Sequence, residues 1–304
     1  MHYQEVSIVD FFSQINSEER ARKLVWRHKF SGKEFNCPVC QSEVYYQYKT
    51  RPEIRKCKRC RTQVRLRAET IFENSKVPIL IWVRLIFLCM SGKRGVSALE
   101  AQKHLKCSSY GVVWGLLQKV RVALGKRDEH YKLKEIVELD STFFGKRSTK
   151  NQKEVLVAVE SKEFTSAKSN KIKKAGFAKV VVATENKAQV TNFIKNNTAS
   201  LGEVHTDGAR SYLHTPADLK IVSVSTHNDH VLNESWLPWV HRFISNAKTW
   251  ILGTHHGVTG KYVHLYLKEY TYRFNRRHDA KRLFDRALFA CTQSQPISLG
   301  ALCG

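Results

Sequence analysis

The 304-residue sequence predicts a multidomain fold of the α+β and α/β types, with a small β module, a helical module and a mixed-sheet domain in that order. Three observations support this prediction. Two cysteine pairs enclose a stretch of alternating aromatic and polar residues, helical periodicity follows them, and apolar strands flank a helix in the second half. The chain is too long for one ordinary compact domain, and its 42% hydrophobic residues are enough for a sizeable core.

The composition is strongly basic, with 51 lysines and arginines against 27 acidic residues and a formal net charge of +24. Such a chain most often binds a polyanion, and nucleic acid is the leading partner. A membrane surface would attract the same charge, but the apolar segment at 77–90 carries Arg84 and is too short to span a bilayer.

The amino terminus lacks the basic start and apolar block of a secretory signal, and four of the eight cysteines form CxxC pairs. We therefore expect a reducing, cytoplasmic compartment and, in a prokaryote, association with the nucleoid.

Six segments are expected along the chain from changes in periodicity and polarity. Apolar residues at helical spacing between 10 and 30 predict a short amphipathic helix or a pair of them. The expected segments are a helical segment at 1–34, a cysteine-containing β module at 35–76, a helical module at 77–124, a polar linker at 125–135, a mixed-sheet domain at 136–290 and a tail at 291–304.

The cysteine pairs give the strongest local signal. Cys37 and Cys40 form one CxxC pair and Cys57 and Cys60 form the other, with sixteen residues between the pairs. Four thiolates at two tight turns complete a tetrahedral zinc site and leave no position open for substrate, so this zinc is structural. The alternatives are four buried cysteines or a redox pair. Basic residues surround the second pair in "RKCKRCR" and suit contact with phosphate, which favours a platform that faces DNA or a partner.

The pattern of the next module predicts a buried helix at 78–91 and then two helices joined by a short turn. Ser97 can cap the first helix of this pair, with Glu100 three residues on, and Ser109 can cap the second, which ends near Leu124. As a helix–turn–helix motif, the pair would place its second helix in a major groove of DNA. The alternative is a pair of ordinary core helices.

The second half of the chain alternates between strands and helices. A lysine-rich polar segment at 161–176 separates the second and third strands and is expected to be a mobile loop facing nucleic acid, with a solvated hairpin loop as the alternative. Three strands, a helix and a fourth strand argue for a mixed sheet. The predicted strands lie at 136–144, 154–160, 178–184 and 203–206, and the helices at 186–197, 238–252 and 262–276.

Two aspartates lie at the ends of predicted strands. Asp140 lies toward the end of the first strand, and Asp207 follows the fourth, where Gly208 lets the backbone turn sharply. If these strands are neighbours in one sheet, as in the RNase H architecture, both carboxylates meet at one edge and can hold a divalent ion. That geometry suits two-metal phosphoryl transfer. Taken singly, each aspartate is more often a surface residue.

Seven blocks of the sequence carry a resemblance to a known family: "CPVC…CKRC", "AETIFENSKVPILIWV", "RGVSALEAQKHL", "VELDSTFFG", "HTDGARSY", "ISNAKTWILGTHHGV" and "YLKEYTYRFNRR". In this order, over about residues 10–290, they resemble the zinc-ribbon insertion-sequence transposases with an ISXO2-like domain, of the wider DDE class. The resemblance implies an RNase H-like catalytic domain that uses Mg²⁺ or Mn²⁺. It also implies a transposase that cuts double-stranded DNA at the ends of its own element and joins the freed 3′ ends to target DNA, as a dimer or larger synaptic complex.

Two positions depart from the family pattern. Many relatives have a second acid directly after the first catalytic aspartate, where this chain has Ser141. They commonly place a glutamate seven residues before a helix lysine, and here those positions are His241 and Lys248. Seven residues are close to two helical turns, so the two side chains share one face. A neutral imidazole can ligate a metal or position water, although it suits Mg²⁺ less well than a carboxylate does. Lys248 could contact a DNA phosphate.

The third metal-site residue has alternatives. No acid lies between Glu234 and Glu269, but Pro238 favours a helix that begins after Glu234. Asn246 lies about 140° round the helix from His241. The expected catalytic set is Asp140, Asp207, His241 and Lys248, with Asn246 and Glu234 as alternatives for the third position. The competing functions are an RNase H-like nuclease that never joins DNA and a decayed transposase that survives as a zinc-ribbon DNA-binding protein.

Overall fold

The computed structural model describes residues 6–145, 151–165, 171–199, 202–209, 220–224, 235–298 and 300. The chain forms two compact units: the first contains Met1–Arg127 and His278–Gly304, and the second contains Asp128–Arg277. No helix of the described residues is long and apolar enough to cross a membrane.

Four helices form the core of the first unit: α1 (Ile8–Gln14), α2 (Glu18–Lys29), α3 (Ile79–Met90) and α10 (Leu283–Gln293), the last preceded by the short 3-10 helix η5 (Ala280–Arg282). α10 packs on α2 and α3. Phe284 of α10 lies edge-on to Phe11 of α1, with ring centroids 5.1 Å apart, and Phe11 stacks on Phe87 of α3 at 3.8 Å. The end of the chain therefore belongs to this unit, whereas the sequence analysis assigned residues up to 290 to the mixed-sheet domain.

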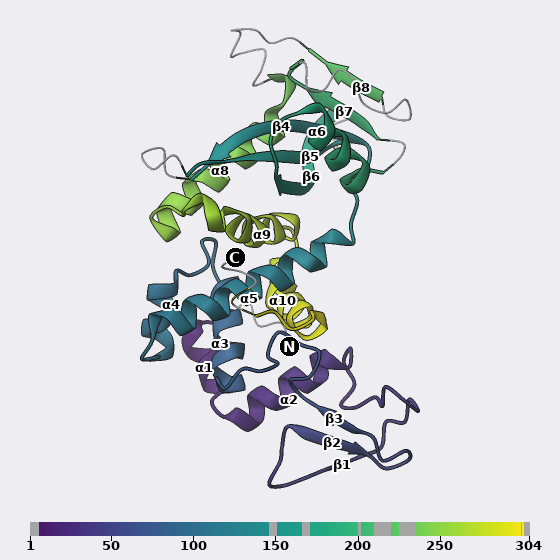
Figure 1. The fold of residues 1–304 in the computed structure, drawn as a ribbon, viewed down its shortest axis with the longest axis vertical. Helices are drawn as coiled ribbons and strands as arrows, with labels where there is room; N and C mark the ends of the chain where they lie inside the picture. The colour runs from purple at the N-terminus through teal and green to yellow at the C-terminus, as the bar shows by residue number, and fades with distance from the viewer. Residues whose placement is uncertain are drawn as a thin grey trace. The chain divides into compact units, whose positions relative to one another are not determined.

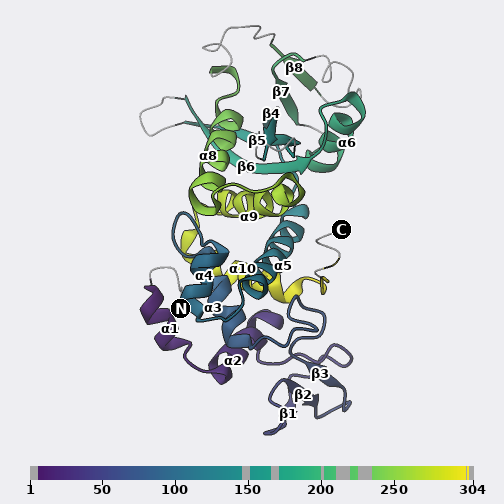
Figure 2. The same ribbon diagram turned by 60° about the vertical axis from the view of Figure 1, so that its left-hand side comes forward.

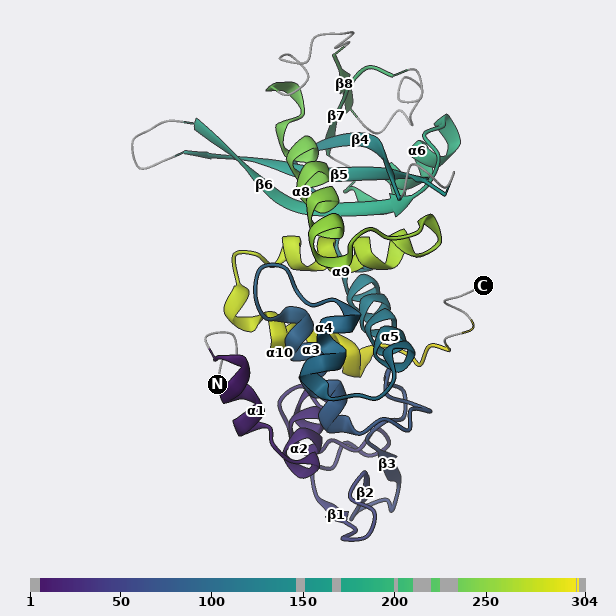
Figure 3. The same cartoon turned by 90° about the vertical axis from the view of Figure 1, so that its left-hand side faces the viewer.

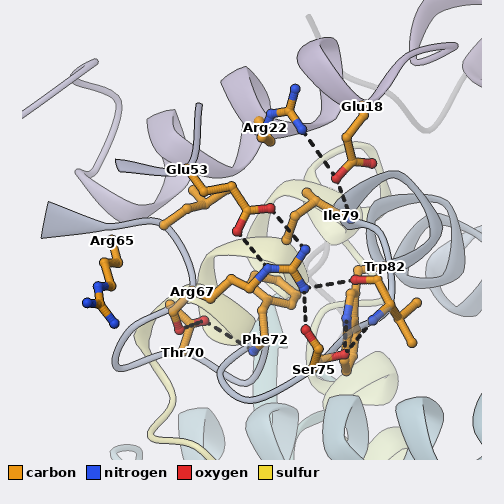
Figure 4. A network of polar contacts seen from close by, with 12 residues as sticks. Glu18, Arg22, Glu53, Arg65, Arg67, Thr70, Phe72, Ser75, Ile79 and Trp82 are labelled. Atoms are coloured by element: carbon orange, nitrogen blue, oxygen red, sulfur yellow. Dashed lines mark hydrogen bonds and ion pairs between the residues drawn. The ribbon is translucent and has the colours of Figure 1, made fainter. Parts of the chain in front are cut away.

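The N-terminus of α3 is capped from another helix. Pro78 precedes α3 and offers no side-chain hydrogen bond. The carboxylate of Glu18 accepts hydrogen bonds from the backbone N–H groups of Ile79 and Leu80, each at 2.8 Å (Figure 4). Because the first N–H groups of a helix have no partner within it, this distant carboxylate satisfies groups that would otherwise stay unpaired.

A three-stranded antiparallel sheet follows the first cysteine pair and surrounds the second, in the order β1 (Tyr45–Gln47), β2 (Ile54–Cys57) and β3 (Gln63–Arg65). Two cations join it to the neighbouring segments, Lys29 from α2 and Arg67 to the segment that precedes α3. Arg67 forms a bidentate ion pair with Glu53, at 2.8 and 3.0 Å, and also donates to the carbonyls of Ser75 and Val77 (Figure 4). Lys29 of α2 donates to the carbonyls of residues 65, 66 and 68, and its burial lowers its pKa to about 8.

The expected helix pair forms as α4 (Ala98–Leu105) and α5 (Tyr110–Glu129). The hydroxyl of Ser97 accepts the N–H of Glu100 at 3.2 Å, which confirms the predicted cap. α5 runs beyond the expected end at 124 into the segment predicted as a linker, because its charged residues at 126–129 are compatible with a helix. Gln118 and Arg121 of α5 are buried and hydrogen-bonded to each other, so they do not present themselves to a DNA groove.

The second unit is built on a five-stranded sheet (Figure 1). Its order is β6-β5-β4-β7-β8; the first three strands are antiparallel, and β7 and β8 run parallel to β4. Residues 161–165 and 171–176 of the segment predicted as a loop are strand, because β5 and β6 continue their pairing through Lys162 and Lys174. The rest of that segment, 166–170, lies outside the described residues. The strands are β4 (Ile136–Phe144), β5 (Lys153–Thr165), β6 (Lys171–Val182), β7 (Glu203–Thr206) and β8 (Lys220–Ser223).

Helices cover this sheet, and side-chain alternation along β4 separates its two faces. Val137 and Leu139 share a buried core with α6 (Lys187–Asn197). The alternate residues Glu138 and Asp140 interact instead with α8 (Pro238–His255), which lies across β4 and β5 (Figure 3). The short 3-10 helix η4 (Gly260–Tyr262) leads into α9 (Val263–Asn275), which lies along β6 (Figure 2).

The N-terminus of α8 is also capped by a distant glutamate. Glu138 of β4 is 2% exposed, and one of its carboxylate oxygens accepts the N–H groups of Trp239 at 2.7 Å and Val240 at 3.0 Å. Pro238 opens the helix, as the sequence predicts, and no side chain at the N-cap position contributes a hydrogen bond. Glu138 therefore fixes the start of α8 on the strand that carries Asp140.

We predict that Glu138→Ala destabilises the second unit by about 2 kcal/mol, because it leaves two buried N–H groups of α8 without an acceptor. Denaturant unfolding followed by circular dichroism measures the change. The matched control is Glu129→Ala, which removes an exposed carboxylate and should change the stability by less than about 0.5 kcal/mol. Equal stability of the two variants would contradict the capping role.

Candidate functional site

The two cysteine pairs adopt the same local backbone geometry. The N–H of Cys37 donates to the carbonyl of Ser42 at 3.0 Å, and that of Cys57 donates to the carbonyl of Thr62 at 2.9 Å. In each turn the residue after the second cysteine has a left-handed backbone, with φ of 57° at Gln41 and 64° at Arg61. These turns bring both cysteines of each pair to the same side of the ribbon.

The four sulfurs form a compact cluster, all within 4.8 Å of one another. Two pairs, Cys37 with Cys60 and Cys40 with Cys57, lie 3.4 and 3.5 Å apart. Tetrahedral zinc with bonds of about 2.3 Å requires sulfurs about 3.8 Å apart, so the set fits this ion. Hydrogen bonding by the hydroxyl and N–H of Thr62 lowers the pKa of Cys60 to about 6. Against a backbone hydrogen bond with Ser42, burial and the three neighbouring thiols raise the pKa of Cys40 to about 11. The fit to zinc therefore rests on the geometry of the four sulfurs. The structure thus supports the predicted structural zinc site.

Basic residues surround this ribbon. Lys58, Arg59 and Arg61 are exposed around the second cysteine turn. A cleft of about 640 Å³ lies beside the Glu53–Arg67 ion pair, and exposed Arg51 and Arg65 line it together with half-buried Arg22. In Figure 4 the side chain of Arg65 extends away from that ion pair. The Arg51 and Arg65 guanidinium groups are positioned to meet phosphate from solvent.

Asp140 lies in β4, and Asp207 directly follows β7, the parallel neighbour of β4. β4 and β7 pair in the register Ile136 with Glu203 and Glu138 with His205. Continuing that register by two residues aligns Asp140 with Asp207, on the face of the sheet toward α8. The condition set by the sequence analysis, that the first and fourth strands be neighbours, is met.

α8 directs two further candidates toward β4. Nε2 of His241 lies 3.4 Å from Oδ2 of Asp140, and Nζ of Lys248 donates to the hydroxyl of Thr142 at 2.7 Å. Both side chains therefore lie on the helix face expected from their spacing. Asn246 is exposed, and Glu234 lies outside the described residues.

A third carboxylate, that of Glu185, acts on Asp207, although Glu185 is not among the predicted site residues. Glu185 lies between β6 and α6, and the Ser141 hydroxyl donates a hydrogen bond to it. Burial raises the pKa of Asp207, and the negative charges of Asp140 and Glu185 raise it further, against the N–H donated by Ala209. The one sequence signal for Glu185 was its position shortly after a predicted strand. Because β5 separates β6 from β4 in the sheet, the sequence alone did not place Glu185 near Asp140.

Asp140, Asp207 and Glu185 form an acidic edge of the sheet, whose donor chemistry suits a hard divalent cation. Asp140, Asp207 and Glu185 offer carboxylate oxygens, which Mg²⁺ and Mn²⁺ prefer, and the repulsion that raises the pKa of Asp207 is what a bound cation relieves. Within the described residues, however, the cysteines form the one group of metal-binding side chains packed within 4.8 Å. The acidic edge therefore has suitable ligands in a wider arrangement.

For the ribbon, we predict that Cys57→Ser abolishes zinc binding and unfolds residues 37–65, because the binding free energy of such a site is folding free energy. Elemental analysis should show about one zinc per chain in the wild type, and hydrogen exchange should lose protection in β1 to β3. Cys107→Ser is the control, since Cys107 lies outside the cluster. Full zinc content in Cys57→Ser would refute the assignment.

For the acidic edge, we predict that Glu185→Gln and Asp140→Asn each lower the pKa of Asp207, because each removes a negative charge that disfavours its ionisation. Carboxyl NMR titration of the metal-free protein measures this value. Glu154→Gln should leave it unchanged, since Glu154 is not among the charges that raise it. An unaltered pKa in Glu185→Gln would remove that residue from the edge.

Two protein families match this chain. The model of the transposase zinc-ribbon domain matches residues 16–63, and the model of the ISXO2-like transposase domain matches residues 132–275. No curated protein and no solved structure matches the chain. The first match contains all four zinc-site cysteines, and the second contains Asp140, Asp207, His241 and Lys248. Together they cover more than half of the sequence, and the chain belongs to the family of zinc-ribbon transposases with an ISXO2-like domain.

Proposed function

We propose that this protein is the DNA transposase of an insertion sequence, which binds the inverted repeats at the ends of its element, cuts there and joins the 3′ ends to target DNA. The observation that carries this proposal is the pairing of β4, which contains Asp140, with β7, which Asp207 directly follows, together with the effect of the Asp140 charge on the pKa of Asp207, all inside the transposase domain. The strand order, in which the first strand lies beside the fourth, supports an RNase H-like catalytic domain.

In this proposal, Asp140 and Asp207 hold Mg²⁺ or Mn²⁺, with Glu185 as a further carboxylate at the same edge. The cation would activate the attacking hydroxyl and stabilise the leaving oxygen of an in-line displacement. His241 lies against Asp140 and orients that carboxylate or the attacking water. Lys248 of α8, which meets β4 at Thr142, contacts a phosphate of the bound strand. No covalent intermediate with the protein is formed.

The zinc ribbon and helical module, about residues 35–124, are proposed to recognise the element ends, on double-stranded DNA and as a dimer or larger complex. The exposed arginines beside the ribbon support phosphate contact. If α4 and α5 act as a helix–turn–helix motif, base contact falls to the first turn of α5, where Tyr110 and Val112 are exposed, because Gln118 and Arg121 are buried. We place this activity in the cytoplasm, beside chromosomal DNA.

Two other functions remain as outcomes of the test. An RNase H-like nuclease would cleave DNA in Mg²⁺ or Mn²⁺ without joining it. A decayed transposase would bind DNA through the ribbon without cleavage in either ion, and the histidine at the third position is the observation that favours it.

Strand transfer tests the proposal, with purified protein, Mg²⁺ or Mn²⁺ and duplexes made from the DNA that flanks the reading frame. Terminal inverted repeats and a short target duplication in that DNA would support it independently. Asp140→Asn and Asp207→Asn should each lower joining at least about 100-fold, because each removes a charge that stabilises the transition state.

His241→Ala should abolish joining and spare end binding, and His241→Glu should keep some activity. Asn246→Ala is the control, since Asn246 is exposed on another part of α8. Intact joining in Asp140→Asn would refute its role. Full activity in His241→Ala with loss in Asn246→Ala or Glu234→Gln would assign the third position to the residue whose change inactivates the protein.

A further inference from the structure

A cleft of about 650 Å³ opens at the end of β4 and lies wholly within the second unit. Most of its walls come from the ends of two of the sequence blocks, "VELDSTFFG" and "ISNAKTWILGTHHGV", and include six side chains from β4, α8 and the segment after α8. These are Thr142, Phe144, Lys248, Ile251, Leu252 and Val258.

The cleft continues directly from the acidic edge. Asp140, Thr142 and Phe144 alternate along β4 and face α8, at intervals of about 7 Å. His241 meets Asp140, and Lys248 meets Thr142, while Nζ of Lys248 lies 5.7 Å from the centre of the Phe144 ring. A DNA strand with its reacting phosphate at Asp140 therefore passes Lys248 next and reaches the cleft after it.

The lining of the cleft suits a ring rather than a phosphate. Phe144, Ile251 and Val258 form a buried apolar floor, and the polar groups of Gln152 and His256 lie at its edge. Among its described lining residues, Lys248 is the one lysine or arginine, and it lies beside the apolar floor. An apolar pocket with a few polar groups is typical of sites for flat organic rings.

The exposure of Leu252 also favours a base as the occupant of the cleft. This large apolar side chain lines the cleft and is 67% exposed. It lies four residues after Lys248 on α8, so both point to the same side of the helix. A basic protein that holds DNA at the adjoining edge would cover Leu252 with part of that DNA, and the apolar part of DNA is the base.

We propose that this cleft binds one unstacked nucleobase of the DNA strand, next to the phosphate held at the acidic edge. The proposal rests on the proposed function for the position of the strand. Lys248 would hold the phosphate at the mouth of the cleft, and the apolar floor with Leu252 would receive the base, which fixes the reactive end in one register.

Binding of modified DNA tests this proposal without a requirement for activity. An abasic nucleotide is placed in turn at each position beside the cleaved end of the duplex, and affinity is measured by fluorescence anisotropy. At one position, loss of the base should weaken wild-type binding about tenfold, which corresponds to base stacking. In Leu252→Ala the same abasic change should have a much smaller effect, because the apolar wall is already gone.

Val9→Ala is the matched control, since Val9 is a similarly exposed apolar residue that lies outside the cleft and outside the proposed recognition module at 35–124. It should retain the full abasic effect. A 5-iodouracil at the sensitive position should cross-link on irradiation to residues 142–145 or 251–258.

Additive effects of Leu252→Ala and the abasic change at every position, or cross-links only to other segments, would overturn the proposal. So would a change of oligomeric state in Leu252→Ala without any coupling to DNA, which would assign the cleft to a second copy of the chain. Strand transfer on unmodified DNA, measured on the same samples, reports separately on the proposed function.

Discussion

The hydrogen bonds between Glu138 and the N-terminus of α8 are the interaction on which the candidate site depends. Glu138 is almost completely buried, and burial raises its pKa even though two N–H groups of α8 favour its charged form. Because Glu138 and Asp140 lie on the same face of β4, the contact that fixes the start of α8 also sets the distance from His241 to Asp140. One strand therefore supplies both the structural anchor and the first candidate ligand.

The first unit uses the same device. α3 directly follows a proline, whereas α8 begins at one; neither has a capping side chain of its own, and Glu18 accepts the first N–H groups of α3. A proline at this place removes one donor, and the remaining donors carry partial positive charge that a carboxylate stabilises. In both units a carboxylate from a distant element thus joins two segments of the chain through a helix end, and Arg67 and Lys29 then join the ribbon to the neighbouring segments.

At the helix ends the charge interactions are favourable, whereas at the acidic edge the neighbouring carboxylates repel one another. Asp207 is half-buried, and its burial together with the negative charges of Asp140 and Glu185 raises its pKa. Lys248 lies further along β4, where it donates to the hydroxyl of Thr142. Such an arrangement of carboxylates stores unfavourable charge interaction that a divalent cation can relieve, which is the expected property of a metal site built for phosphoryl transfer.

The sequence by itself determined the features that depend on local signals. The CxxC spacing defined the zinc ribbon, because each pair needs only one tight turn. The periodicity of apolar residues located the strands 136–144 and 203–206, and Pro238 located the start of α8. The family resemblance, read from seven blocks, was confirmed by two family matches.

Only the tertiary structure decided which of these elements meet. The pairing of β4 with β7, the packing of α10 with the first unit, and the position of Glu185 beside Ser141 join residues far apart in the chain. Periodicity reports which side of an element is buried and not what covers it, so it did not predict that Gln118 and Arg121 lie inside, or that the lysine-rich segment continues the β5–β6 pairing. The candidate residues follow from the sequence, and their geometry follows from long-range strand order and from the buried glutamate that fixes α8.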